Sequence, residues 1–230
     1  MKGNVIVGQS GGPTAVINSS LVGVYKTAKD RGAKKIYGML HGVQGLLEEK
    51  VVDLSEHIRN DLDIELLKRT PSSYLGSCRY KLPNIAEDEE TYKKIFAILK
   101  KLQIEYFFYI GGNDSMDTIK KLSDYAMIRG IDIRFIGVPK TIDNDLAATD
   151  HTPGYGSAAK YISSILKEVI RDGLVYDQKN VTIVEIMGRN AGWLAGAAAL
   201  ARCEDCEGPD MIFLPEINFD ICLLYTSRCV

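Results

Sequence analysis

Short apolar runs alternate along the chain with longer segments in which apolar residues recur every three or four positions. A short apolar run is typical of a buried strand, and the longer period is typical of an amphipathic helix. Strands are expected at residues 4–7, 34–39, 106–110, 131–136, 181–186 and 211–216, with a minor strand at 51–54. Helices are expected at residues 14–29, 61–68, 87–102, 115–128, 158–171 and 193–201. This alternation predicts an α/β fold, with a second α/β unit that begins near residue 146.

Three of the expected strands end in loops rich in glycine or charged residues: Gly11–Gly12, Gly111–Asp114 and Lys140–Asp145. The carboxyl ends of parallel strands lie on one edge of a sheet, and ligands of open α/β sheets bind outside that edge. We therefore expect the three loops to converge on one site.

The densest group of reactive side chains follows the strand at 131–136. Lys140, Thr141, Asp143 and Asp145 stand within six residues. A structural turn could use one aspartate, but it has less need of this combination. The grouping favours a functional site over a turn.

The glycine loops allow two interpretations each. A strand, two glycines and a helix start present backbone N–H groups to a phosphate, as Gly11 and Gly12 would, but the same residues also make a plain tight turn. Asp114 and Ser115 suit a helix N-cap as well as a ligand site. No Walker sequence occurs. The glycine-rich residues 41–47 are expected to form a loop.

Composition excludes several classes of function. The chain has 230 residues, a net charge of -2 and a pI of about 6.0, so it offers no basic field for nucleic acid. No apolar run approaches the ~18 residues of a membrane span, and we expect no signal peptide. The few, irregular cysteines suit a reducing cytoplasm. Cys203 and Cys206 form a lone C-x-x-C pair, for which two ordinary thiols are favoured over zinc.

Five segments match a known family in order and spacing. They are residues 10–12, 76–79, 111–115, 139–145 and 187–189. In them the chain resembles the phosphofructokinases over residues 4 to about 220. The resemblance implies two Rossmann-like three-layer α/β/α domains, the second incomplete. It assigns residues 1–145 to the phosphoryl donor and 146–221 to the sugar phosphate. It also implies Mg²⁺, a cytoplasmic place in glycolysis and, at full length, a homo-oligomer.

The resemblance also implies roles for single residues. Asp143 corresponds to the base for the 1-hydroxyl of fructose 6-phosphate, with Lys140 and Asp145 as its catalytic neighbours. The sugar phosphate would be bound by Thr141, Asp143, Met187, Gly188 and Arg189. The phosphoryl donor would be bound by Gly11, Gly12, Arg79, Gly112, Asp114 and Ser115. Asp114 and Asn113 correspond to the metal-binding position, where the family commonly has Asp in place of Asn113.

Two residues decide which donor is expected. Members that use ATP usually have glycine at the positions of Asp114 and Lys140, and members that use inorganic diphosphate have Asp and Lys. A carboxylate at 114 would repel the α-phosphate of a nucleotide. A lysine at 140 would stabilise charge on the transferring phosphoryl group. We expect diphosphate as donor; the alternatives are an ATP-dependent 6-phosphofructokinase and a non-catalytic homologue.

Besides Asn113, the chain departs from the family pattern at three places. Many members have arginine at the position of Asn180, where it reaches a neighbouring subunit. Residues 222–230 resemble no part of the family and are expected to be a non-native tail. The family continues for about a hundred residues or more, with further sugar-phosphate ligands. We therefore expect the polypeptide as written to be a C-terminally truncated fragment that folds poorly and has little activity.

Overall fold

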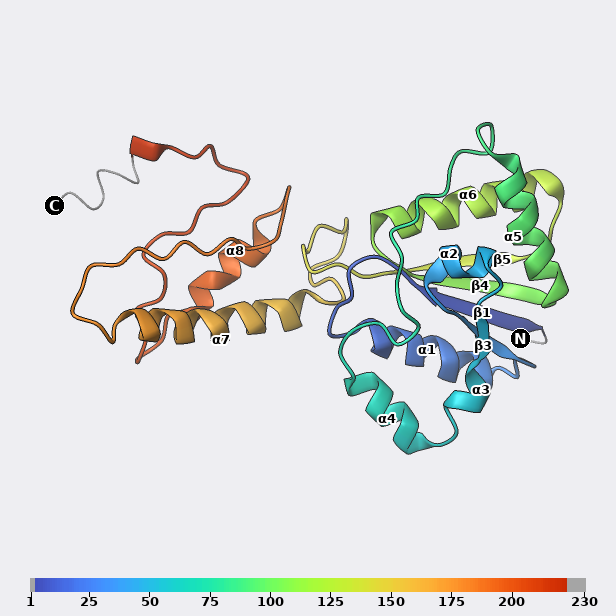
Figure 1. Cartoon of the computed structure of the whole chain (residues 1–230), viewed down its shortest axis with the longest axis horizontal. Coiled ribbons are helices and arrows are strands. Elements are labelled where there is room, and N and C mark those ends of the chain that lie inside the picture. Colours follow the sequence, from blue (N-terminus) through green and yellow to red (C-terminus); the bar gives the residue numbers. More distant parts are fainter. Residues whose placement is uncertain (1–2, 223–230) are drawn as a thin grey trace. The chain divides into compact units, whose positions relative to one another are not determined.

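The structure is a computed structural model that describes residues 3–222, and it comprises two compact units (Figure 1). Unit 1 is Met1–Thr141 and unit 2 is Ile142–Val230. This boundary lies four residues before the expected one, after residue 145. The assignment of the donor to one part and the sugar phosphate to the other stays a prediction.

Unit 1 is built on a five-stranded sheet in the order β3-β2-β1-β4-β5. Its strands are β1 (Asn4–Gln9), β2 (Ile36–Met39), β3 (Val51–Asp53), β4 (Ile104–Gly111) and β5 (Arg134–Pro139). β2, β1, β4 and β5 are parallel, and β3 is antiparallel to β2. The sequence therefore predicted all five strands of this sheet. Its parallel core and Rossmann-like order confirm the α/β class.

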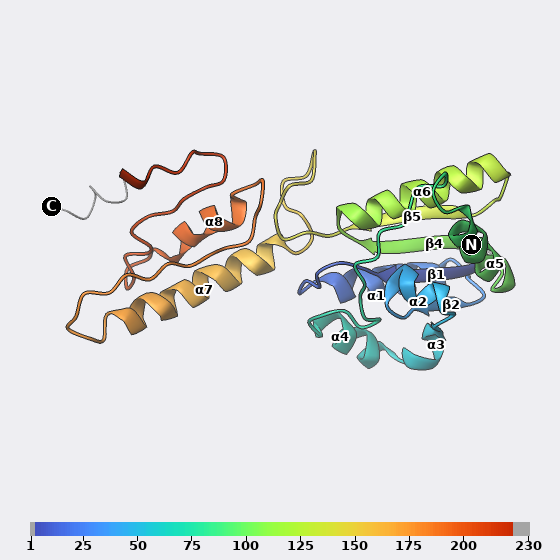
Figure 2. The ribbon, with the colours of Figure 1, turned by 45° about the horizontal axis from the view of Figure 1, so that its top comes forward.

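Helices cover both faces of this sheet, as Figures 1 and 2 show. They are α1 (Ile17–Asp30), α2 (Gly42–Leu47), α3 (Leu54–His57), α4 (Asp61–Arg69), α5 (Glu89–Lys101) and α6 (Asn113–Arg129). α2, α5 and α6 lie on one face, and α1, α3 and α4 lie on the other. This arrangement gives unit 1 three layers.

The structure corrects the sequence-based expectation at two of these helices. Residues 42–47 form α2 and not a loop, because Val43 and Leu46 are buried in the core and Gly42 lets the helix approach Tyr109 closely. The N-cap of α6 is Gly112, whose extended backbone makes no side-chain cap bond. Asp114 and Ser115 therefore lie inside the first turn of α6 and do not cap it.

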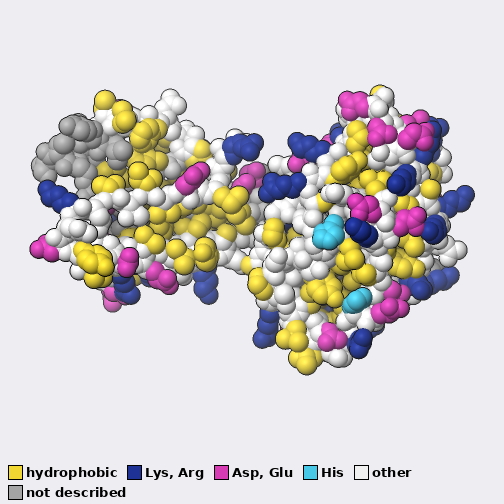
Figure 3. Space-filling model, in the orientation of Figure 1, with side chains coloured by type: hydrophobic (Ala, Val, Ile, Leu, Met, Phe, Trp, Pro, Cys, Tyr) yellow, Lys and Arg dark blue, Asp and Glu magenta, His cyan; other side chains and the backbone are white. Residues whose placement is uncertain are grey.

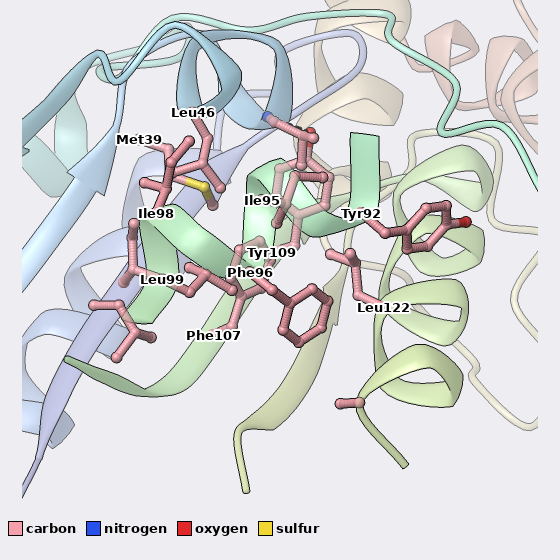
Figure 4. Close-up of a cluster of buried hydrophobic side chains, with 14 of the residues drawn as sticks. Met39, Leu46, Tyr92, Ile95, Phe96, Ile98, Leu99, Phe107, Tyr109 and Leu122 are labelled. Atoms are coloured by element: carbon pink, nitrogen blue, oxygen red, sulfur yellow. Dashed lines mark hydrogen bonds between the residues drawn. The ribbon is translucent and has the colours of Figure 1, made fainter. Parts of the chain in front are cut away.

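Two hydrophobic clusters fill the space on either side of the sheet. Side chains of β1 alternate between them, with Ile6 in one and Val5 and Val7 in the other, as strand geometry requires. The first cluster is shown in Figure 4, where Phe107 of β4 lies among side chains of α5. Both clusters consist mainly of the periodic apolar positions from which the elements were predicted, to which others such as Val43, Leu46, Leu75 and Leu82 are added.

Unit 2 contains helices but no named strand among its described residues. α7 (Tyr155–Gly173), α8 (Trp193–Ala197) and the 3-10 helix η1 (Ala198–Ala201) pack around Leu166, Ala198 and Ala201. The strands expected at 181–186 and 211–216 are wrong, because no strand among the described residues of unit 2 supplies them with a ladder. Figure 3 shows hydrophobic side chains on the visible face of unit 2, over α7 and α8. No helix within residues 3–222 is both long enough and apolar enough to cross a membrane.

Candidate functional site

The order of the strands creates a topological switch point between β1 and β4. From β1 the chain passes to β2 on one side, whereas β4 lies on the other side of β1. Ligands of open α/β sheets bind outside the carboxyl ends of the strands at such a switch point. At that point lie the loop Ser10–Gly12 and the junction of β4 with α6, Gly111–Asp114, which contain two of the three segments predicted from the sequence.

The Gly11 loop is joined to the segment that carries Arg79. The backbone N–H of Gly11 donates to the Cys78 carbonyl at 3.0 Å, and the Ser77 hydroxyl donates to the Gly11 carbonyl at 2.5 Å. The Ser10 hydroxyl also donates to the Cys78 carbonyl, at 3.2 Å. Gly11 has a φ of 76°, which favours glycine. The structure thus brings together two segments that are 66 residues apart.

Lys140 connects the end of β5 to both glycine loops. Its backbone N–H donates to the Gly111 carbonyl at 3.0 Å. Its ammonium Nζ lies 3.2 Å from the point where a Cβ on Gly11 would stand, so the charged end is directed to the Gly11 loop. The residue is only 5% exposed, which is unusual for lysine. A buried ammonium directed to a glycine loop forms an environment suited to an anion.

The first turn of α6 presents the other predicted donor residues. Asn113 and Asp114 are exposed, and the Asp114 carboxylate lies 3.6 Å from the ammonium of Lys81. Both side chains are largely exposed, so this ion pair contributes little to stability. Ser115 is 2% exposed and packs against Gly111, where a Cβ would lie 2.0 Å from its hydroxyl oxygen. Its backbone N–H donates to the Gly112 carbonyl at 3.0 Å, so a contact of Ser115 with the donor stays a prediction.

The side of the site that faces solvent holds Gly12 and Arg79. Both residues are exposed. No described atom lies within 4 Å of the position that a Cβ on Gly12 would take. The nearby hydroxyl of Thr14 is the buried side-chain oxygen that, within the described residues, has no hydrogen-bond partner. Sequence reasoning did not single out Thr14, because a threonine after a proline carries no special signal.

Cys78 and Tyr109 form a buried polar pair behind the Gly11 loop. The Cys78 thiol and the Tyr109 hydroxyl are 3.5 Å apart, and the backbone N–H of Val43 donates to that hydroxyl at 3.3 Å. Burial raises the pKa of Tyr109 above its ordinary value. Burial also acts to raise the pKa of Cys78, but hydrogen bonds, the largest from Tyr109, outweigh it and leave that pKa lowered. The polar groups of both side chains are therefore hydrogen-bonded beneath the Gly11 loop.

The predicted residues of unit 2 lie in two segments. In the first, Asp143 is half-buried and Asp145 is exposed, with Asn144 between them at 6% exposure and a φ of 58°. The Asn144 amide donates to the Asp150 carbonyl at 3.0 Å and accepts from the Thr152 N–H at 2.8 Å. Asn144 therefore fixes the turn that carries both carboxylates, a role that the sequence motif did not reveal.

The second segment of unit 2 is the loop Met187–Arg189. Gly188 has a φ of 135°, and a Cβ there would lie 2.5 Å from the Ala191 carbonyl oxygen, so the turn requires glycine. Met187 and Arg189 are exposed on either side of it. Each segment has its own defined geometry, and the joint action of Asp143 and Arg189 stays a prediction.

The chain is similar to proteins of one family. The Phosphofructokinase family pattern matches residues 4–227. The pyrophosphate–fructose 6-phosphate 1-phosphotransferase of Rhodospirillum rubrum is 45% identical over 221 residues, which cover 96% of this chain and 52% of that protein. The sulfofructose kinase of Alkalicoccus urumqiensis is 37% identical over 218 residues, which cover 94% of this chain and 54% of that protein.

A solved structure agrees with these sequence relatives. The pyrophosphate-dependent phosphofructokinase of Nitrosospira multiformis superposes with a TM-score of 0.87 at 40% sequence identity and covers 97% of this chain and 56% of that one. The chain thus spans about half the length of the curated relatives that it matches. The family match extends into the tail 222–230, which the motifs alone place outside the resemblance, and residues 223–230 lie outside the described part. The chain belongs to the phosphofructokinase family.

Proposed function

We propose that this chain carries the donor site and the catalytic turn of a diphosphate-dependent phosphofructokinase. The reaction is the transfer of a phosphoryl group from inorganic diphosphate to the 1-hydroxyl of fructose 6-phosphate. The observation that carries this proposal is the place of Lys140, whose buried ammonium is directed to the Gly11 loop at the switch point of the sheet. The 45% identity to the Rhodospirillum rubrum phosphotransferase supports diphosphate as the donor.

Charge at the two ends of this site favours diphosphate over ATP. The Lys140 ammonium would stabilise the charge that develops on the transferring phosphoryl group and on the leaving orthophosphate. The Asp114 carboxylate, on the first turn of α6, would repel the α-phosphate of a nucleotide. The backbone N–H of Gly12, together with Arg79, would contact the diphosphate oxygens, whereas the N–H of Gly11 is donated to the Cys78 carbonyl.

The acceptor reacts at the catalytic turn. The oxygen of the 1-hydroxyl attacks the terminal phosphorus of diphosphate, the bond from that phosphorus to the bridging oxygen breaks, and orthophosphate leaves. Asp143 accepts the hydroxyl proton as general base. Asp145 orients the site beside it, and Asn144 holds both carboxylates in place through its two hydrogen bonds. Thr141 and the loop Met187–Arg189 bind the sugar phosphate.

Magnesium fits the donor end of the site. Mg²⁺ usually reaches a protein through one or two carboxylates, keeps several waters and binds substrate phosphates. Asp114 offers an exposed carboxylate for this purpose, and the neutral Asn113 adds at most one carbonyl oxygen. No group of three or more acidic, histidine or cysteine residues suited to a metal occurs within residues 3–222. The ion would therefore bind mainly through diphosphate, whose negative charge it would neutralise.

Calorimetric titration of the purified 230-residue chain with diphosphate and with ATP, each with Mg²⁺, tests the donor. We expect diphosphate to bind more tightly than ATP. The double variant Asp114→Gly and Lys140→Gly should reverse this order, because it removes both the repulsion and the extra cation. Tighter binding of ATP to the unchanged chain would overturn the donor assignment in favour of an ATP-dependent enzyme.

The acceptor is tested separately by turnover of a full-length version of the protein, because the 230-residue chain itself is expected to have little activity. Fructose 6-phosphate and sulfofructose are offered with diphosphate and Mg²⁺, since one relative is a sulfofructose kinase. Formation of fructose 1,6-bisphosphate that is lost in Asp143→Asn supports the proposal. Preferential phosphorylation of sulfofructose would show that fructose 6-phosphate is not the acceptor, and it would not affect the assignment of the donor site.

A further inference from the structure

The side chain of Gln9, at the carboxyl end of β1, is fully buried and makes hydrogen bonds through both ends of its carboxamide. The Nε2 amide donates to the Asn18 Oδ1 at 2.9 Å and to the Ile17 carbonyl at 3.2 Å. The Oε1 accepts from the Leu75 N–H at 2.9 Å and from the Ser73 hydroxyl at 3.0 Å. One side chain thus connects the last residue of β1 to the start of α1 and to the loop that precedes Arg79.

Asn18, in the first turn of α1, completes the same network. Its amide donates to the Thr70 carbonyl at 2.9 Å, and its carbonyl oxygen accepts from the Tyr74 N–H at 2.9 Å as well as from Gln9. Asn18 is fully buried. The two carboxamides together make four hydrogen bonds to residues 70–75, and buried networks whose members are all satisfied rigidify the segments that they connect.

The held segment leads directly into the donor site. Three residues after Leu75 the chain reaches Cys78, whose carbonyl accepts from the N–H of Gly11, and the next residue is Arg79. Ser77 returns a hydrogen bond to Gly11. The loop is therefore fixed at one end by carboxamides and at the other by the Gly11 loop. At metal sites, groups that orient the ligating residues are worth about tenfold or more in affinity, and we expect an effect of that order here.

We propose that Gln9 and Asn18 are positioning residues for the diphosphate site, which they align by holding residues 70–79 against the Gly11 loop. This inference rests on the proposed function for its ligand. It differs from a purely structural role, in which the buried amides would stabilise unit 1 without affecting the geometry of Gly11 and Arg79.

A matched residue separates these two roles. Asn4 lies at the opposite end of β1, and its buried amide donates to the Leu102 carbonyl at 2.7 Å. Asn4 and Asn18 are thus buried carboxamides of the same kind, each bonded to a distant backbone carbonyl. Asn4→Ala should lower the melting temperature as Asn18→Ala does, but only Asn18→Ala should affect the donor site.

Two measurements on the 230-residue chain test the proposal. Hydrogen–deuterium exchange follows the amides of Gly11 and residues 77–79, which do not bond to Asn18 themselves, and calorimetric titration gives the Kd for diphosphate with Mg²⁺. In Asn18→Ala we expect faster exchange at those amides and a Kd raised about tenfold. In Asn4→Ala we expect both to stay at the values of the unchanged chain.

A milder variant covers the case in which Asn18→Ala does not fold. The half-buried Ser73 bonds to Gln9 at 3.0 Å and to the Gly76 carbonyl at 2.6 Å, so Ser73→Ala should accelerate the same exchange and Ser73→Thr should restore it. Unchanged exchange at Gly11 in Asn18→Ala or Ser73→Ala would overturn the positioning role. Faster exchange in these variants, together with no binding of diphosphate by the unchanged chain, would support the alignment of the loop and overturn the proposed donor instead.

Discussion

Two apolar runs of similar length form different structures in the two units. Residues 134–139 form β5, which pairs with β4 along its whole length. Residues 181–186 are at least as apolar but form no strand, and Val181 and Ile183 are 89% and 88% exposed. The difference shows that an apolar run specifies a strand only where a neighbouring strand offers free N–H and C=O groups. In unit 1, β4 offers them; the described part of unit 2 contains no named strand to do so.

The largest effect on stability is expected from the buried Phe107 in unit 1, in contrast to the exposed Ile183 in unit 2. Phe107 is fully buried and contacts the rings of Tyr109 and Phe135, so Phe107→Ala should lower the free energy of unfolding of unit 1 by about 3–5 kcal/mol. Ile183→Ala, at an exposed position, should change the free energy of unfolding of unit 2 by less than about 0.5 kcal/mol. Urea unfolding followed by circular dichroism measures unit 1. The fluorescence of Trp193, the chain's single tryptophan, measures unit 2. A large loss in Ile183→Ala would show that 181–186 is packed after all.

Alkaline pH should destabilise unit 1 selectively. Burial raises the pKa of Tyr92 to about 12, and burial likewise raises the pKa of Tyr109. Because these folded-state values exceed the unfolded value near 10, their contribution to stability is fully present below pH 10 and is lost as the pH rises toward 12. Tyr92→Phe should flatten this loss, at the cost of the Tyr92 bond to the Pro83 carbonyl. Unfolding curves recorded at each pH check this. An equally steep loss in the variant would contradict it.

Much of unit 1 follows from sequence, because local periodicity and the tertiary environment agree there. The strands, most helices and the convergence of Gly11, Gly112 and Lys140 on one edge were all predictable from apolar spacing and parallel topology. The helical α2 was not, since its glycines serve close packing rather than a turn. The roles of Gln9 and Asn144 were also hidden, because a buried carboxamide network depends on contacts between residues distant in sequence.

Asn144 offers a moderate effect confined to unit 2. Asn144→Ala loses two hydrogen bonds to residues 150–152. It also places alanine at a φ of 58°, a left-handed conformation that asparagine adopts more readily. Together these changes should destabilise the turn by about 2 kcal/mol. Asn144→Gly restores the backbone freedom but not the bonds, so its loss should be smaller. Trp193 fluorescence during thermal unfolding gives the order of the two variants. An Asn144→Gly chain as unstable as Asn144→Ala would show that the left-handed backbone contributes nothing.

The smallest expected effect on stability is also the sharpest test of the Gly11 loop. A Cβ on Gly12 would meet no described atom within 4 Å, and the same holds for Gly23 in the middle of α1. Gly23→Ala should therefore stabilise unit 1 by about 0.5–1 kcal/mol through its helix propensity, without affecting ligands. Gly12→Ala should leave stability within about 0.5 kcal/mol of the unchanged chain.

The methyl group of Gly12→Ala should affect the affinity for a ligand rather than the stability of the chain. If backbone N–H groups of this loop contact diphosphate, the added Cβ obstructs that close approach, and the Kd for diphosphate should rise several-fold in Gly12→Ala but not in Gly23→Ala. Calorimetric titration of both variants supplies the comparison. Equal affinities would reduce Gly11–Gly12 to the plain tight turn that the sequence also allows, and the donor would then have to be held from the Lys140 side of the crevice alone.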